Sequence, residues 1–224
     1  MSFRRVERRS SFRINILALE SAVTLAAYVL ALRAFVSPAH TLRIGALAAF
    51  GAVYYARLNT MARWLLPREL ALEEVTFVAL VWIPGILASF VVGAAATSSN
   101  SKSHDLSPLQ LWSIAAAYGA GSWLNTWSEL QRKWFKARPV NKGRCFTGGL
   151  FAWSRNINYL GDVVLFGAWA AATSAWWNMW VPAVMFLSFK FYHIPDKERY
   201  LAQRYAREWP AYAAKTAALV PGVC

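Results

Sequence analysis

Six apolar runs, separated by polar or charged stretches, dominate the pattern along the chain. They cover residues 14–36, 42–58, 75–96, 109–127, 159–175 and 176–194. A helix that crosses a hydrocarbon core of ~30 Å needs about 20 predominantly apolar residues. The first four runs fit this length approximately, and the last two are joined so closely that they predict a tight helical hairpin or a re-entrant pair. The pattern predicts an all-α, multi-pass transmembrane protein of about six spans.

The composition supports this interpretation. Apolar residues make up 57% of the 224 residues and charged residues only 16%, whereas soluble domains carry about 25% charged residues. The apolar content excludes a disordered chain, and two cysteines cannot supply a disulfide framework. An ordinary soluble enzyme is therefore disfavoured, and we expect membrane lipid to surround the chain.

The distribution of charge predicts an orientation. Lys and Arg number 24 against 11 Asp and Glu, a formal net charge of +13. The basic residues gather in the arm of residues 1–13, in the loops after the second and fourth runs, and in the tail. All of these lie on one side if the runs alternate, so the positive-inside rule puts both termini in the cytoplasm. Because these residues form no continuous basic face, we expect no nucleic-acid partner.

Polar residues at the entry to the fifth run form the first candidate site. If a helix begins near Asn156, then Asn158 and Asp162 share one face, with Tyr159 three residues before Asp162. An ionisable side chain about one turn inside the membrane is costly and marks a functional candidate. An acid near a helix N-terminus can also simply stabilise the helix dipole, and the spacing leaves both interpretations open.

The tail is the second candidate. Tyr205, Trp209 and Tyr212 follow i, i+4, i+7 spacing beside Arg204. This spacing predicts a cytoplasmic amphipathic helix, which could lie in the membrane interface or offer stacking rings beside a phosphate-binding charge. Pro210 is expected to end or kink this helix near Trp209.

A third cluster follows the fourth run directly. Arg132 and Lys136 are four residues apart, so on a continuous helix both would point at the same anion. Taken alone, cytoplasmic charge that anchors the helix to anionic lipid explains the pair better. His40, His104 and His193 are too scattered along the chain for a metal site, and we predict none.

Three motifs occur in order over residues 121–224. They are Gln131-Arg-x-x-Phe135-Lys136, then Asn158-Tyr-Leu-Gly-Asp162, then Glu198 … Tyr205-x-x-x-Trp209-x-x-Tyr212, which ends in Val220-Pro-Gly-Val. Together they resemble the C-terminal half of the sterol reductases, the family of sterol carbon-14 reductase, 7-dehydrocholesterol reductase and sterol carbon-24(28) reductase. Steroid 5-reductases and isoprenylcysteine carboxyl methyltransferases are more distantly similar.

The resemblance implies an NADPH-dependent reductase of a carbon–carbon double bond in a sterol or related isoprenoid lipid, in the endoplasmic reticulum membrane. Residues 14–127 would form four transmembrane helices and residues 128–224 the cofactor-binding region, in which the fifth helix entrance and the tail close on the cofactor. Asp162 matches the acid near the double bond, which implies that it donates or relays the proton while NADPH supplies the hydride. The implied cofactor-binding residues are Arg132, Lys136, Phe151, Asn158, Tyr159, Glu198, Leu201, Arg204, Tyr205 and Tyr212.

Several features separate the chain from the family pattern. Asn156 stands where the family has a His, and Lys197 where it has an Asp. The helices that supply a catalytic Tyr in the family have no counterpart here, so a partner subunit is left open. Two alternatives remain: a methyltransferase of the isoprenylcysteine type that uses S-adenosylmethionine, and a non-catalytic sterol-binding membrane protein. The phosphate-side charges favour the reductase, because S-adenosylmethionine carries no phosphate.

Overall fold

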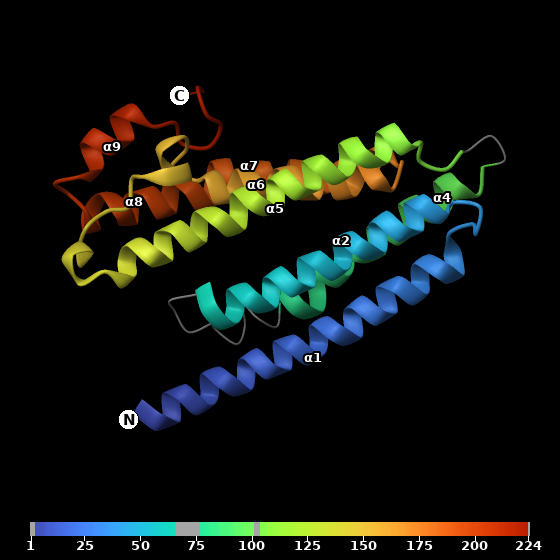
Figure 1. Cartoon of the computed structure of the whole chain (residues 1–224), viewed down its shortest axis with the longest axis horizontal. Coiled ribbons are helices and arrows are strands. Elements are labelled where there is room, and N and C mark those ends of the chain that lie inside the picture. The colour runs from blue at the N-terminus through green and yellow to red at the C-terminus, as the bar shows by residue number, and fades with distance from the viewer. Residues whose placement is uncertain (1–2, 66–76, 101–103, 224) are drawn as a thin grey trace. The chain divides into compact units, whose positions relative to one another are not determined.

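A computed structural model describes residues 3–65, 77–100 and 104–223 as helices joined by turns, and no strand occurs among them (Figure 1). This confirms the all-α class. The helices that carry the apolar runs are α1 (Phe3–Phe35), α2 (Thr41–Thr60), α4 (Ile83–Ser98), α5 (Pro108–Ala137), α6 (Ile157–Ala172) and α7 (Trp180–Ser188). The tail contains α8 (Ile194–Arg204) and α9 (Trp209–Lys215). The side chains of the basic arm, residues 1–13, lie outside the described residues.

Within the described ranges, two helical segments are long and apolar enough to cross a membrane, Ala18–Phe35 and Leu80–Ser98, and Ile157–Ala172 is a shorter apolar helix. Large apolar side chains are exposed along both long segments, as Leu30 and Val92 illustrate at 67% and 63% exposure. Exposed apolar surface of this kind is typical of a membrane-facing helix. These features support membrane association, while the count of six spans and the orientation of the termini stay predictions.

The chain forms two compact units. The first comprises Met1–Ile114 and Trp169–Asn178, and the second comprises Ala115–Ala168 and Met179–Cys224. Both α5 and α6 pass from one unit into the other. The candidate residues of the second half of the sequence all belong to the second unit.

Two prolines inside long helical stretches are each preceded by a π-helical turn. The turn Val78–Trp82 leads into α4 ahead of Pro84, and the turn Phe189–His193 joins α7 to α8 ahead of Pro195. Proline has no backbone N–H and its ring clashes with the carbonyl four residues earlier. A wider turn relieves this conflict, so the helical path continues through both prolines.

The core of the first unit is built around Trp169. Its indole N–H donates to the Tyr28 hydroxyl at 3.1 Å, and the rings of Tyr54 and Phe90 lie 5.7 and 5.5 Å from its ring. Aromatic rings at these separations add favourable edge contacts to the apolar area they bury. Trp169 therefore ties the end of α6 to α1, α2 and α4.

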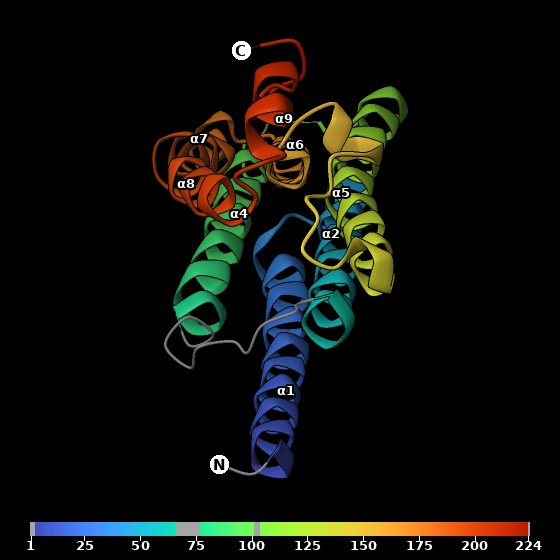
Figure 2. The ribbon, with the colours of Figure 1, turned by 90° about the vertical axis from the view of Figure 1, so that its left-hand side faces the viewer.

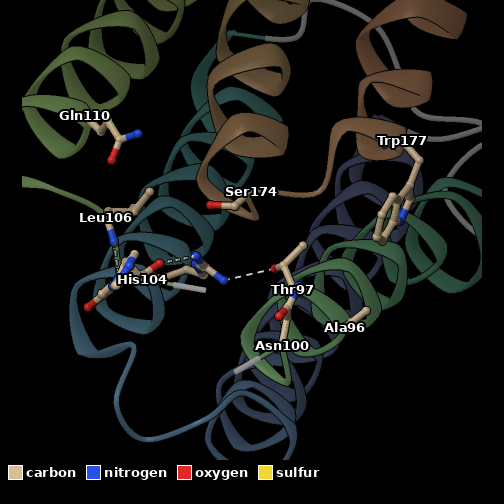
Figure 3. Close-up of a pocket in the computed structure, with 10 residues that line it drawn as sticks. Ala96, Thr97, Asn100, His104, Leu106, Gln110, Ser174 and Trp177 are labelled. Carbon is tan, nitrogen blue, oxygen red and sulfur yellow. Dashed lines mark hydrogen bonds between the residues drawn. The ribbon is translucent and has the colours of Figure 1, made fainter. Parts of the chain in front are cut away.

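A polar cluster closes one end of the first unit. The Asp105 carboxylate accepts backbone hydrogen bonds from Leu42 and Arg43 at the start of α2, at 2.7 and 3.0 Å. The Arg43 side chain, only 2% exposed, donates to the Thr97 hydroxyl and to the His104 carbonyl. A cavity of about 510 Å³ is bordered by Arg43, Thr97 and His104, and also by Asp105 (Figure 3). The hydrogen bonds link the start of α2 to the end of α4 and the following loop.

In the second unit α5 and α6 cross in very close contact. A Cβ added to Gly121 would lie 2.5 Å from the backbone nitrogen of Leu165, and one added to Gly161 would lie 2.7 Å from that of Asn125. Neither separation is sterically possible, so only glycine allows this approach. The crossing brings Asn125 of α5 against the first two turns of α6, where the first candidate site was expected.

Candidate functional site

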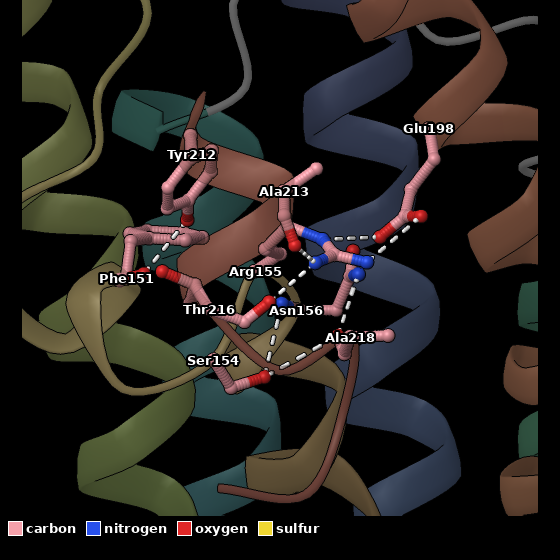
Figure 4. Close-up of polar contacts among 9 residues, drawn as sticks. All are labelled: Phe151, Ser154, Arg155, Asn156, Glu198, Tyr212, Ala213, Thr216 and Ala218. Atoms are coloured by element: carbon pink, nitrogen blue, oxygen red, sulfur yellow. Dashed lines mark hydrogen bonds and ion pairs between the residues drawn. The ribbon is translucent and has the colours of Figure 1, made fainter. Parts of the chain in front are cut away.

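Arg155 connects three segments of the second unit just before α6. Its guanidinium donates to both carboxylate oxygens of Glu198 in α8, at 2.8 and 3.2 Å (Figure 4). It also donates to the backbone carbonyls of Ala213, at 2.6 Å, and Thr216. A planar guanidinium can satisfy several acceptors at once in fixed directions. One side chain therefore holds the entrance of α6, α8 and the tail together. The ribbon shows α8 and α9 of the tail side by side (Figure 2).

Asn156 and Ser154 strengthen the same junction. The Asn156 side-chain amide donates to the Ala218 carbonyl at 2.9 Å, and the Arg155 backbone N–H donates to the Ala217 carbonyl, also at 2.9 Å. The Ser154 hydroxyl accepts the Asn156 backbone N–H at 3.2 Å just before the helix. Asn156, which replaces the His of the family pattern, thus binds the end of the tail. The expected approach of these two stretches is present.

Phe151 contributes its backbone to this junction. Its carbonyl accepts a 2.7 Å hydrogen bond from the Tyr212 hydroxyl. Its ring is only 4% exposed and packs with Leu150 and Ile157. Burial raises the pKa of Tyr212, and the nearby Cys145 thiol adds to this effect, so the hydroxyl keeps the proton it donates.

The tail differs from the single helix that the spacing predicts. Helix α8 ends at Arg204, residues 205–208 form a turn, and α9 begins at Trp209. Pro210 lies in the first turn of α9, where its missing N–H has no cost. It therefore starts a helix rather than ending one. Despite the turn, the predicted aromatic residues meet in one cluster around buried Cys145, formed by Trp209, Tyr212, Leu201 and Tyr205.

Lys136 lies against Tyr205. Its ammonium donates to the Tyr205 hydroxyl at 2.9 Å, contacts the Arg144 carbonyl, and sits 4.7 Å from the centre of the Tyr205 ring. Arg204 also donates to the Tyr205 hydroxyl, at 3.4 Å. Partial burial acts to raise the pKa of Tyr205, but these two donors and their charges outweigh it and lower the pKa.

Arg132 points to a different partner. Its guanidinium pairs with the carboxylate of Glu129, one turn earlier on α5, and Glu129 is only 6% exposed. The i, i+4 pair of Arg132 and Lys136 is therefore on one helix, as the sequence predicts, but the two cations contact separate groups.

Asn158 and Asp162 are joined through a residue of α5. The Asn125 side-chain amide donates to the Asn158 backbone carbonyl at 3.1 Å and to a carboxylate oxygen of Asp162 at 2.9 Å. This agrees with the shared helix face predicted from their spacing. The side-chain oxygen of Asn158, a residue 9% exposed, is buried and finds no hydrogen-bond partner among the residues that the structure describes. A buried acceptor of this kind is unfavourable until a ligand or water donates to it.

The Tyr159 ring contacts one side chain in the turn that precedes α8 and one in α8 itself. Its ring stacks on Phe189 with centroids 4.5 Å apart and planes 10° from parallel. The Lys197 ammonium lies 4.6 Å from the centre of the same ring. These two contacts connect the first turn of α6 to the start of α8.

A carboxylate in the turn before α9 fixes the loop that follows α5. Glu208 pairs with Arg144 and accepts the Cys145 backbone N–H at 2.6 Å. This backbone hydrogen bond, followed by the bond and charge of Arg144, lowers the pKa of Glu208. The carboxylate therefore remains ionised and keeps the loop against the tail.

The analysis of the sequence missed four residues that shape this site: Asn125, Glu129, Lys197 and Glu208. Asn125 and Glu129 are polar residues in or just after an apolar run, and their i, i+4 spacing places them on one helix face. That signal could have identified them. Glu208 gave no signal, because its partners Arg144 and Cys145 are more than 60 residues away.

A family model described as a protein of unknown function, DUF1295, matches residues 17–216. The match covers nearly the whole chain, including every candidate residue of the second unit. No curated protein matches the chain.

Proposed function

Since this chain belongs to the DUF1295 family, which is associated with steroid reductase-like proteins, we propose that it is an NADPH-dependent membrane reductase of a carbon–carbon double bond in a sterol or related isoprenoid lipid. The observation that carries this proposal is the junction at Arg155. A dinucleotide is long, and it needs a site to which several segments contribute. The entrance of α6, α8 and the tail supply such segments, and Arg155 fixes them together through Glu198 and the tail carbonyls.

The residues around the junction fit a phosphorylated nucleotide. Arg132, Lys136, Lys197 and Arg204 supply positive charge that can bind phosphate groups. The unpartnered buried oxygen of Asn158 can accept a hydrogen bond from an amide or hydroxyl of the ligand. The ring of Tyr205 offers a flat surface for stacking. NADPH would supply the hydride when bound.

Asp162 would hold the proton that reduction of the double bond requires. Its carboxyl lies one turn after Asn158, and the amide of Asn125 fixes one of its oxygens at 2.9 Å. This hydrogen bond fixes the orientation of the carboxyl group. A carboxyl group positioned in this way can serve as a general acid.

The proposal is tested by thermal unfolding of the purified, detergent-solubilised chain with NADPH or with S-adenosylmethionine. A ligand that binds only the native state raises the melting temperature. We expect NADPH to raise it and S-adenosylmethionine to leave it unchanged, and Asn158→Ala to weaken the NADPH effect. A shift with S-adenosylmethionine alone would assign the chain to the methyltransferases. No shift with either ligand would leave the non-catalytic lipid-binding protein.

A further inference from the structure

The Lys197 ammonium, near the start of α8, lies beside the Tyr159 ring of α6, and no described carboxylate pairs with it. Among the described residues it has no hydrogen-bond or ion-pair partner, and its one contact is the Tyr159 ring at 4.6 Å. The two carboxylates whose charges act on it, Glu129 and Glu198, already pair with Arg132 and Arg155. An ammonium that is partly removed from water and has no acceptor is unfavourable unless an anion joins it.

The charge of a second cation acts on Lys197. Arg132 is among the charges that act on Lys197, and it repels the ammonium. The Arg132 side chain remains 36% exposed beside its pair with Glu129, and the Lys197 side chain is half-buried, so solvent reaches both. Two like charges near enough to repel each other are typical of a site that binds a multiply charged anion.

We infer that Lys197 and Arg132 together bind a phosphate group of the nucleotide cofactor, with the Tyr159 ring holding the ammonium in position. The inference rests on the proposed function for the identity of the nucleotide. It adds a residue that the resemblance does not supply, because the family pattern has an acid at this position. Lys136 is not part of this phosphate site, because its ammonium is bound to Tyr205 and to the Arg144 carbonyl.

The site makes binding depend on pH. Burial, and then the charge of Arg132, lower the pKa of Lys197 to about 8, against the raising effects of Glu129 and Glu198. An anion favours the charged ammonium, so binding takes up a proton when the pH is near or above this value. Affinity is therefore full below the pKa of Lys197 and falls as the pH rises through it.

The test measures sulfate binding to the detergent-solubilised chain by calorimetry at pH values below and above this pKa. Sulfate is chosen because its own charge does not change over these pH values. We expect Lys197→Met to weaken sulfate and NADPH binding about tenfold or more below the pKa. Lys197→Arg should retain binding and lose the pH dependence, since arginine stays charged. Lys142→Met, which removes an exposed lysine of the same unit, should behave as the unmodified chain.

Each result decides the inference separately from the proposed function. Unchanged sulfate and NADPH affinity in Lys197→Met would overturn the inference and leave the reductase proposal in place. Sulfate binding that depends on Lys197, in a chain that does not bind NADPH, would support the anion site and overturn the reductase proposal. Loss of sulfate binding with full NADPH binding in Lys197→Met would overturn the assignment of this site to the cofactor.

Discussion

The carboxylate of Glu198 accepts two hydrogen bonds from the guanidinium of Arg155, at 2.8 and 3.2 Å. The side chains are 12% and 23% exposed for Arg155 and Glu198, so water does little to replace the pair. Since Arg155 also binds the carbonyls of Ala213 and Thr216, it connects the start of α6 to both α8 and the tail. The stability of this junction can be measured separately from any activity.

Removal of the carboxylate should destabilise the chain. Glu198→Ala leaves the half-buried Arg155 without its ionic partner, and we expect a loss of about 1.5–3 kcal/mol in the free energy of unfolding. Asp196→Ala is the matched control, because its pair with Arg199 is long, at 3.5 Å, and highly exposed, and such pairs contribute little. Equal effects of the two substitutions in denaturant titrations would contradict the role given to Glu198.

The contact between α5 and α6 should tolerate no side chain. Gly161→Ala would put a Cβ 2.7 Å from the Asn125 backbone nitrogen, so the helices must separate, at a cost of about 1–3 kcal/mol or more. Separation would also weaken the hydrogen bond from Asn125 to Asp162. Gly119→Ala, in the partner helix α5 with open space around it, should be neutral or stabilise by up to about 1 kcal/mol. Thermal unfolding of the two variants distinguishes them.

Cys145 should report whether the tail is docked. The thiol is 9% exposed among Trp209 and Tyr212, and burial raises its pKa, so it should react slowly with maleimide. Tyr212→Phe removes the hydrogen bond to the Phe151 carbonyl, at a cost of about 1 kcal/mol, and should speed the reaction about fivefold. Tyr200→Phe, an exposed change in α8, is the control. The measurement requires Cys224→Ser, so that one thiol reacts.

Stability should fall at acid pH through Glu208. The pKa of this carboxyl is lowered in the folded chain, first by the backbone hydrogen bond from Cys145. Its contribution is therefore present above the unfolded pKa and is lost as the pH falls through the folded value. Glu208→Gln should flatten this acid limb in melting temperatures measured against pH. An acid limb of unchanged steepness in the variant would assign the effect to other carboxylates.

Asp162→Asn should separate chemistry from binding. The amide keeps the size of the side chain but has no proton to donate as an acid, so turnover should fall about 100-fold or more. NADPH should still raise the melting temperature by the same amount. Asn125→Ala removes the amide that orients Asp162 and also binds the Asn158 carbonyl, and it should lower kcat less than Asp162→Asn. Full turnover in Asp162→Asn would remove this residue from the mechanism.

Local periodicity predicted the helices and part of the site. The described part of each apolar run is largely helical, and the shared face of Asn158 and Asp162 follows from spacing within one helix. The tail was predicted as one helix because Tyr205, Trp209 and Tyr212 have helical spacing, yet the chain turns at residues 205–208. The reason is tertiary: Glu208 reaches back to Arg144 and Cys145, and those contacts outweigh helical continuity. Spacing also could not show that Arg132 and Lys136 contact different groups, because their partners depend on packing.

The π-helical turn ahead of Pro195 sets the angular phase of everything after it. A wider turn accommodates an additional residue, so the side chains beyond it are rotated by about 100° from where an uninterrupted α-helix would direct them. Lys197 and Glu198 follow this turn directly. A helical wheel drawn straight from α7 into α8 would aim both residues away from Tyr159 and Arg155. The turn required by Pro195 thus determines which face of α8 directs Lys197 and Glu198 toward α6.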